Sequence, residues 1–442
     1  MIKQVIFAVI LAITLGVFGY TVSSLAALFR LTKPTAPVKD IGKRILLTLR
    51  VALGQSKIFR KPVVGLMHAL VWWGFLIILI GSIEMVIDGL TGTERALGFL
   101  GVVYNIIIAS GDVFALVIGI VVIAFLIRRI FMHINRFEGV EMKHKYHLDA
   151  NISLLLILFL MITLLGYNTF YIIDSELSGN ELKGVYPVSF YISGLIEGIS
   201  VSMAHIIMEI NWWGHILGIF FFANYLPYSK HFHVFMSVPN VFLSNLEPRG
   251  KMTTMDDITK EVKLMMDTDT AYAEPPEEEG EPGRFGVLDI EDITWRNYLN
   301  SLACTQCGRC TSVCPANITG KLLSPRKIMI DLRERMKEKG PGLVKNGKGW
   351  GDGKTLLDDY ITPEELWACT TCNACVQECP VNINQLSVIL DMRRYIVMEQ
   401  SKAPGELNQV FSNIENNGAP WQFSQEDRMK WAEDLYMNQP ES

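Results

Sequence analysis

The eight cysteines of this 442-residue chain lie close together and repeat one spacing. The first run is Cys304, Cys307, Cys310 and Cys314, followed by Pro315, and the second is Cys369, Cys372, Cys375 and Cys379, followed by Pro380. This spacing with a trailing proline is the one that holds two [4Fe–4S] clusters, and the fourth cysteine of each run then binds the other cluster. The sequence therefore predicts one cluster on Cys304, Cys307, Cys310 and Cys379, and a second on Cys369, Cys372, Cys375 and Cys314.

The eight histidines all lie in a different part of the chain, between His68 and His233. His215 and His233 are 18 residues apart, so a continuous helix would place them on one face, about 27 Å apart. We expect His68 to lie at the depth of His233, on a facing helix. Two imidazoles from facing helices at one depth are what a b-type haem needs as axial ligands. The sequence therefore predicts a haem between His68 and His233.

Two alternatives for the other histidines stay open. His231 and His233 could be interfacial residues beside Lys230, and positions 231 and 233 differ by about 200° around a helix, so only one of them could face the bundle. We prefer His233 because it is in phase with His215. His215, with His205, could hold a second haem or form one wall of a quinone pocket.

Three polar residues are candidates for handling protons at a quinone. They are Asp112 within the third apolar run, Glu197 in the loop that follows the fourth, and His205. Ionisable groups at membrane depth are functional candidates by default. Asp112 could equally be hydrogen-bonded in a contact between helices.

Five apolar runs in the first 245 residues approach or exceed the roughly 20 residues that cross a bilayer. They cover residues 5–29, 63–83, 102–127, 152–173 and 212–228. The first is too long for the apolar region of a signal peptide, and five runs in one half of the chain argue against a soluble helical core. The stretch 191–207 is interrupted by Gly194, Glu197 and Gly198. We expect it to form a separate helix that lies on the outer leaflet or dips into it.

The loops between these runs differ in charge. The loop after the first run carries nine Lys and Arg and the loop after the third carries five, whereas the loops after the second and fourth carry only Arg95 and Lys183. Positive loops stay in the cytoplasm, so we expect a multi-pass protein of a prokaryotic cytoplasmic (inner) membrane with its N-terminus outside. The cysteines then lie in the cytoplasm, where clustered thiols indicate metal sites rather than disulfides.

Composition divides the chain in two. Hydrophobic residues make up 50% and charged residues 19%, and residues 1–245 carry a net charge of +5 against −10 for residues 246–442. This excludes a mainly disordered chain and a purely soluble enzyme, and the acidic second half argues against nucleic-acid binding. We expect an all-α protein: a five-helix transmembrane haem domain (1–245), a charged linker (246–294) centred on residues 274–283, a cytoplasmic helical ferredoxin-like domain with two clusters (295–400), and a tail (401–442).

These motifs resemble known membrane iron–sulfur oxidoreductases. The first half resembles the gamma subunit of respiratory nitrate reductase, in which four histidines hold two haems. Here His68, His215 and His233 match that pattern and the fourth position falls at about Ile78, which favours the pair His68–His233. The second half resembles the helical ferredoxin domains of heterodisulfide reductase and of anaerobic glycerol-3-phosphate dehydrogenase.

The order of the whole chain is similar to that of electron-transfer-flavoprotein:menaquinone oxidoreductases and of the membrane module of sulfite-reduction complexes. Residues 413–421, with Arg428 and Trp431, look like the segment that precedes the cysteine-rich catalytic domain of those proteins, and no cysteine follows Cys379. The resemblance implies that a separate cysteine-rich iron–sulfur subunit is a partner and that the tail contacts it.

The resemblance and the residues together predict a quinone-linked oxidoreductase subunit in a lipid membrane. It would pass electrons between a cytoplasmic partner, such as an electron-transfer flavoprotein, and the menaquinone or quinone pool. The first alternative is a quinol-linked thiol or disulfide reductase module. A different class of function is a non-catalytic membrane anchor or sensor.

Overall fold

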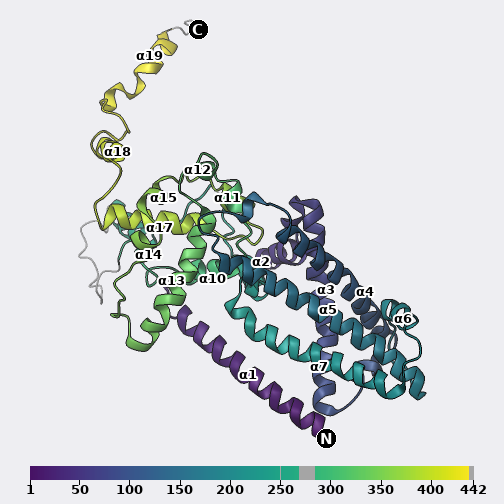
Figure 1. The fold of residues 1–442 in the computed structure, drawn as a ribbon. Helices are drawn as coiled ribbons and strands as arrows, with labels where there is room; N and C mark the ends of the chain where they lie inside the picture. Colours follow the sequence, from purple (N-terminus) through teal and green to yellow (C-terminus); the bar gives the residue numbers. More distant parts are fainter. Residues whose placement is uncertain (249, 268–283, 438–442) are drawn as a thin grey trace.

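The computed structural model describes residues 1–248, 250–267 and 284–437, and it has a helix bundle, a C-terminal domain and an extended arm (Figure 1). The described residues form helices and only two isolated β-bridges, Lys33 with Thr294 and Leu357 with Ile361. The predicted all-α class is confirmed. The most acidic part of the expected linker, residues 274–283, lies outside the described residues.

The bundle consists of the five long helices, joined by short ones. The long helices are α1 (Ile2–Phe29), α3 (Pro62–Thr91), α4 (Val102–Ile130), α5 (His144–Ser178) and α7 (Val201–Tyr225). The connecting elements are α2 (Ile41–Thr48), η1 (Leu49–Leu53), η2 (Ile58–Arg60), η3 (Ala96–Leu100), η4 (Asn135–Phe137), α6 (Pro187–Ser193), η5 (Leu226–Tyr228), η6 (Lys230–Phe232) and α8 (His233–Phe242).

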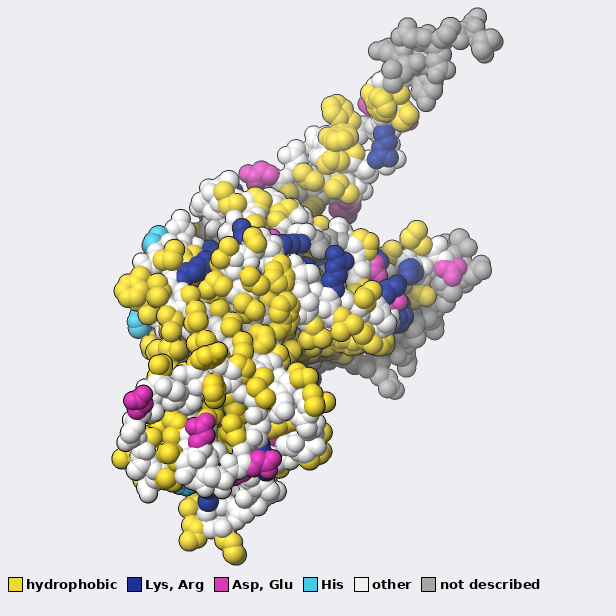
Figure 2. Space-filling model, turned by 90° about the vertical axis from the view of Figure 1, so that its right-hand side faces the viewer, with side chains coloured by type: hydrophobic (Ala, Val, Ile, Leu, Met, Phe, Trp, Pro, Cys, Tyr) yellow, Lys and Arg dark blue, Asp and Glu magenta, His cyan; other side chains and the backbone are white. Residues whose placement is uncertain are grey.

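All five long segments are apolar enough and long enough to cross a membrane, which confirms the predicted number of spans. Local sequence sets their ends: α3 begins at Pro62 and ends before Gly92, which has a left-handed φ of 75°. In Figure 2 hydrophobic side chains cover much of the visible bundle surface, and Lys and Arg gather towards its border with the C-terminal domain. This is the pattern of a bundle that faces lipid, with a basic rim at one end.

The fifth span begins earlier than predicted. The stretch 191–207 is not one interfacial helix, because α6 ends at Ser193 and α7 begins at Val201 and continues to Tyr225. The Ser200 side chain caps α7 by accepting a hydrogen bond from the Met203 backbone N–H. The interruption at Gly194–Gly198 therefore separates a short helix from the span.

The C-terminal domain surrounds the two cysteine motifs with short helices. Its elements are α9 (Asp256–Met266), α10 (Trp295–Ala303), α11 (Arg309–Ser312), α12 (Pro315–Ile318), α13 (Pro325–Asn346), α14 (Leu356–Asp359), α15 (Pro363–Trp367), α16 (Ala374–Glu378) and α17 (Gln385–Met398). The arm that leaves it consists of α18 (Gly405–Asn417), η7 (Gln425–Met429) and α19 (Lys430–Met437). The packed part of the domain begins before residue 295, since Val287, Ile290 and Ile293 are buried in its core.

The core of the C-terminal domain continues into one end of the bundle. Leu28 and Phe29 at the end of α1 pack against the domain core, and the rings of Phe29 and Tyr298 lie 4.7 Å apart. The backbone of Lys33 pairs with residues 293 and 295. The C-terminal domain is therefore held against one end of the bundle, called here the domain end.

A buried ion pair fixes the loop between α4 and α5 to α13. Arg326 is 1% exposed, and its Nε donates to Glu141 Oε1 at 2.7 Å. Its Nη1 and Nη2 donate to the backbone oxygens of Arg136 and Glu138. All three nitrogens of this guanidinium thus donate to the bundle's loop.

We expect Glu141→Ala to destabilise the junction between domain and bundle by about 3–5 kcal/mol, because it leaves the buried Arg326 charge without its partner. Thermal unfolding and limited proteolysis of the detergent-purified protein measure this loss. Lys345→Ala, an exposed change on the same helix α13, is the control and should leave both unchanged. Equal stability of the two variants would contradict the role of this ion pair.

Candidate metal centre

Four of the predicted ligands surround one cavity. Cys304, Cys307 and Cys310 line it from the first motif, and Cys379 lines it from the end of α16. Burial first, and then the neighbouring Cys307 and Cys304 thiols, raise the pKa of Cys379 to about 12. The fourth cysteine of the second run thus lies beside the first three of the first run.

The remaining four cysteines form a second neighbourhood. Burial first, and then the thiols of Cys369, Cys314 and Cys372, raise the pKa of Cys375 to about 12. Cys314 therefore lies among the cysteines of the second run, as Cys379 lies among those of the first. Both neighbourhoods favour the crossed pairing that the spacing predicts.

The two motifs have the same backbone conformation around their second cysteine. Gln306 and Gly308 flank Cys307 with φ values of 57° and 75°, and Thr371 and Asn373 flank Cys372 with φ values of 56° and 59°. Left-handed residues on both sides of the middle cysteine curl the chain around a central point. A side chain at Gly308 would also collide with the Arg136 backbone oxygen, which lies 2.1 Å from the Cβ position. Glycine is needed there because the bundle's loop passes so close.

Backbone amides point at the sulfurs. The Thr371 N–H donates to Cys369 Sγ at 3.4 Å, and the Ile383 N–H donates to Cys379 Sγ at 3.3 Å. Such N–H···S contacts stabilise negative charge on sulfur and adjust the reduction potential of a cluster. The chain therefore has the cradle that cluster thiolates require.

The arrangement fits clusters better than single ions. A zinc ion with Zn–S bonds of about 2.3 Å needs its four sulfurs within about 4 Å of one another. Within the described ranges, no three His, Cys, Asp or Glu side chains converge closely enough to hold one metal ion. The four cysteines of the first set instead line one common cavity, as the ligands of a larger iron–sulfur core would.

The two neighbourhoods differ in exposure. Cys304, Cys310 and Cys379 are buried and the first cavity faces the bundle, where Arg309 donates to the backbone oxygen of Lys57 at 2.9 Å. In the second neighbourhood Cys372 is exposed. The first set therefore lies at the domain end of the bundle and the second set opens to solvent.

Three histidines gather at the domain end of the bundle. His68 is in the second turn of α3, and both His231 and His233 lie within electrostatic range of it. The rings of His231 and His233 are 5.1 Å apart. One ring nitrogen of His68 is buried and has no hydrogen-bond partner among the described residues. This imidazole could therefore bind a haem iron without first breaking a hydrogen bond at that nitrogen.

The helix through these histidines is not continuous, which corrects the sequence-based geometry. α7 ends at Tyr225, two 3₁₀ turns follow around Pro227, and His233 begins α8. Proline ends the α-helix because it has no N–H to donate and its ring crowds the preceding turn. The predicted common face of His215 and His233 is therefore wrong. The 200° separation of positions 231 and 233 does not apply either, because Lys230–Phe232 is a 3₁₀ turn and the rings of His231 and His233 lie 5.1 Å apart.

His215 is buried in the bundle core, apart from the three histidines at the domain end. Its Nδ1 lies 3.0 Å from the Leu160 backbone oxygen and 3.1 Å from Thr163 Oγ1, and its Nε2 is buried with no partner among the described residues. This orientation is typical of a metal-binding imidazole. Leu160 also packs in the cluster that holds Ile78, where the resembled family has its fourth histidine. His205 is not near His215: its side chain is 55% exposed and faces Asp174 at 3.5 Å.

The quinone candidates have different surroundings. Asp112 is 1% exposed and accepts hydrogen bonds from the backbone N–H groups of Val188 and Ser189, from the Ser189 hydroxyl and from Asn168. It thus caps α6 and joins it to α4 and α5. Glu197 is exposed in the loop between α6 and α7. The hydrogen bonds of Asp112 favour the helix-contact alternative.

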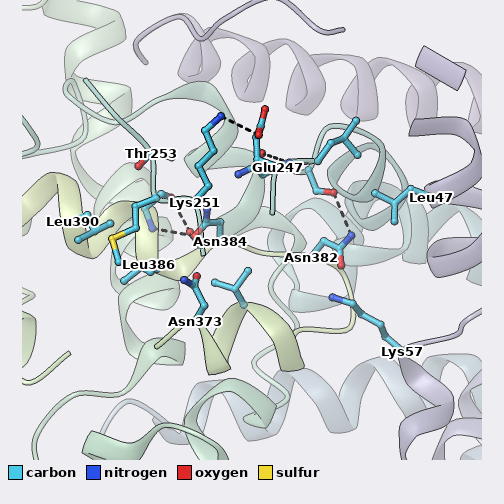
Figure 3. A pocket seen from close by; sticks show the side chains of 16 residues that line it. Leu47, Lys57, Glu247, Lys251, Thr253, Asn373, Asn382, Asn384, Leu386 and Leu390 are labelled. Carbon is cyan, nitrogen blue, oxygen red and sulfur yellow. Dashed lines mark hydrogen bonds and ion pairs between the residues drawn. The ribbon is translucent and has the colours of Figure 1, made fainter. Parts of the chain in front are cut away.

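A larger cavity lies beside the second cysteine motif (Figure 3). Asn373, Asn382 and Lys57 line it, and Asn382 donates to Ser244 Oγ at 3.2 Å. Lys57 also donates to the backbone oxygen of Cys379 at 3.1 Å. The cavity therefore lies where the loop after η1, the loop after α8 and the second motif meet.

Sequence reasoning missed the arginines around the cysteines. Arg309 and Arg326 line the first cavity, and Arg333 and Arg393 contact backbone oxygens of cysteines. The sequence contains a pattern that could have indicated some of these arginines, since basic residues alternate with apolar ones along residues 322–339. Such a pattern is ordinary for a surface helix, and only the fold turns these positions inwards.

Comparisons with known proteins agree with this geometry. A family model described as a 4Fe-4S dicluster domain matches residues 303–383. The chain is 29% identical over 463 aligned residues to the Probable iron-sulfur-binding oxidoreductase FadF of Bacillus subtilis, covering 98% of this chain and 61% of that protein. It is 26% identical to the EtfAB:quinone oxidoreductase of Syntrophomonas wolfei, covering 89% of this chain and 54% of that protein.

A shorter match reaches the Probable membrane-anchored ferredoxin of Chromohalobacter salexigens, with 36% identity over 34% of this chain and 24% of that protein. No solved structure matches the chain significantly. The chain thus spans a little over half the length of the first two relatives. Over most of its own length it is similar to iron–sulfur oxidoreductases, as the resemblance implied.

Proposed function

We propose that this chain is the membrane electron-transfer subunit of a quinone-linked iron–sulfur oxidoreductase. The observation that carries the proposal is the placement of the cysteines. One set, with three of its four cysteines buried, faces the histidine end of the bundle, and the other set includes the exposed Cys372. When bound, two [4Fe–4S] clusters and a b-type haem supply one-electron chemistry, and the protein supplies position and tuning.

The residues that hold these groups are assigned as follows. Cys304, Cys307, Cys310 and Cys379 hold the cluster at the bundle, called cluster 1, and Cys369, Cys372, Cys375 and Cys314 hold the exposed cluster, called cluster 2. His68 and His233 hold the haem. His215 Nε2 is buried with no partner among the described residues. Ile78, where the resembled family has its fourth histidine, packs in one cluster with Leu160, whose backbone oxygen faces His215 Nδ1. Isoleucine cannot ligate iron, which supports one haem rather than two.

The orientation follows from the basic residues at the domain end of the bundle. Lys57, Arg60 and Arg309 hold the two parts together there: Arg60 pairs with Glu378 at 3.3 Å, and Arg309 and Lys57 make the contacts given above. Positive residues mark the cytoplasmic side, so the clusters lie in the cytoplasm of a prokaryotic cell and the N-terminus lies outside.

The partner is proposed to approach the Cys372 side. The name of the Syntrophomonas relative pairs an electron-transfer flavoprotein with quinone, so that flavoprotein and the quinone pool are the proposed donor and acceptor. The arm carries exposed Trp421, Phe423 and Trp431, which suit a contact with a separate cysteine-rich subunit.

The test is a reduced-minus-oxidised spectrum and iron quantitation of the purified chain, followed by identification of the protein that copurifies with it. A b-type haem signal, about eight non-haem irons per chain and a flavoprotein partner together support the proposal. A disulfide-handling partner favours the quinol-linked reductase alternative, and absence of haem favours the anchor.

A further inference from the structure

Two arginines make the same contact with the two cysteine motifs. Arg333 lies on α13, the long helix after the first motif, and its Nη1 donates to the Cys304 backbone oxygen at 3.2 Å. Arg393 lies on α17, the helix after the second motif, and its Nη2 donates to the Cys369 backbone oxygen. Cys304 and Cys369 are the first cysteines of their runs. The backbone oxygen of the first cysteine in each motif thus accepts a hydrogen bond from one guanidinium.

Neither charge is neutralised by an ion pair. The buried arginines Arg326 and Arg335 are both paired with carboxylates. Arg333 and Arg393 form no ion pair in the part of the chain that the structure describes. Arg333 is 5% exposed and its Nε has no partner among those residues, and Arg393 lies 4.9 Å from the Trp367 ring. A full positive charge therefore remains beside each cysteine set.

We infer that Arg333 and Arg393 are the positioning residues that set the reduction potentials of cluster 1 and cluster 2, respectively. This inference rests on the proposed function. Reduction adds one negative charge to a cluster, and a nearby cation stabilises the reduced form, so each arginine raises the potential of its own cluster. An unpaired unit charge within about 10 Å, in the effective dielectric of a protein, changes a one-electron equilibrium by about a decade.

The experiment is a redox titration of the full chain in detergent, followed by electron paramagnetic resonance so that each cluster is read separately. Arg333→Gln is expected to lower the equilibrium constant for reduction of cluster 1 about tenfold, which lowers its potential by about 59 mV for one electron. The potential of cluster 2 should not change. Arg393→Gln is expected to do the reverse. Arg333→Lys and Arg393→Lys keep the positive charge, so the potentials in these variants should lie close to those of the wild type.

Arg394→Gln is the matched control, because Arg394 adjoins Arg393 on α17 but bonds to Asp391 at 2.7 Å. It should move neither potential. Arg393 is only partly buried, so its variant preserves the test if Arg333→Gln fails to assemble cluster 1.

The inference would be overturned if both clusters are intact and neither potential changes in either variant. It would also be overturned if each substitution shifts both potentials together. The wild-type protein is titrated first, so the absence of two [4Fe–4S] signals there would refute the proposed function instead.

Discussion

Cys379→Ala is expected to abolish cluster 1 and to leave cluster 2 assembled, although Cys379 belongs to the second run. The reason is geometric: Cys379 shares its cavity with Cys304, Cys307 and Cys310. A cubane with a missing thiolate is lost, so the non-haem iron content should fall from about eight to about four per chain. Iron analysis and electron paramagnetic resonance of the reduced protein measure both effects.

The design needs reference variants that identify the surviving signal. Cys307→Ala removes cluster 1 and Cys372→Ala removes cluster 2 under either pairing. The spectrum of Cys379→Ala should match that of Cys307→Ala, and the spectrum of Cys314→Ala should match that of Cys372→Ala. Ser312→Ala, an exposed change in α11, should keep both clusters. A Cys379→Ala spectrum that matches Cys372→Ala would show that the pairing is not crossed.

His68→Ala is expected to remove the b-type haem almost completely. One axial nitrogen disappears, and the remaining ligand cannot hold the macrocycle in the bundle core. The haem content of the purified protein, measured from its reduced-minus-oxidised spectrum, tests this. His147→Ala is the control, because His147 lies on α5 in the first turns and has no assigned ligand role.

Because His68, His231 and His233 lie together, the second haem ligand has to be identified by separate variants. His233→Ala is expected to lose the haem and His231→Ala to keep it, since His233 Nδ1 lies 3.2 Å from the Lys230 backbone oxygen, which orients its other nitrogen as a ligand. Full haem content in His68→Ala would refute the assigned pair. Loss of haem in His231→Ala but not in His233→Ala would move the second ligand to His231.

The features that sequence reasoning predicted are those that neighbouring residues determine. The number of spans follows from apolar runs, and both cysteine neighbourhoods follow from a local spacing that three ligands of a cubane require. Asn384 before α17 is a local signal too, because its side chain accepts a hydrogen bond from the Ser387 N–H.

The features that it missed depend on contacts between distant segments. Nothing near Glu141 in sequence indicates that it will meet Arg326, 185 positions away. Val287, Ile290 and Ile293 look like part of a charged linker until the domain core is assembled around them. The break at Pro227 had a visible cause, but its consequence, two histidine rings side by side, depends on two successive 3₁₀ turns that periodicity does not describe.

The central claim is that the cysteine sets and the histidines form one electron path, and the rate of haem reduction by a large donor tests it most directly. The protein is placed in lipid nanodiscs and mixed with a reduced electron-transfer flavoprotein, which is too large to reach the bundle core. The haem should be reduced in the wild type but not in Cys379→Ala, with the haem still bound in both. Equal rates of haem reduction in the two proteins would contradict the account.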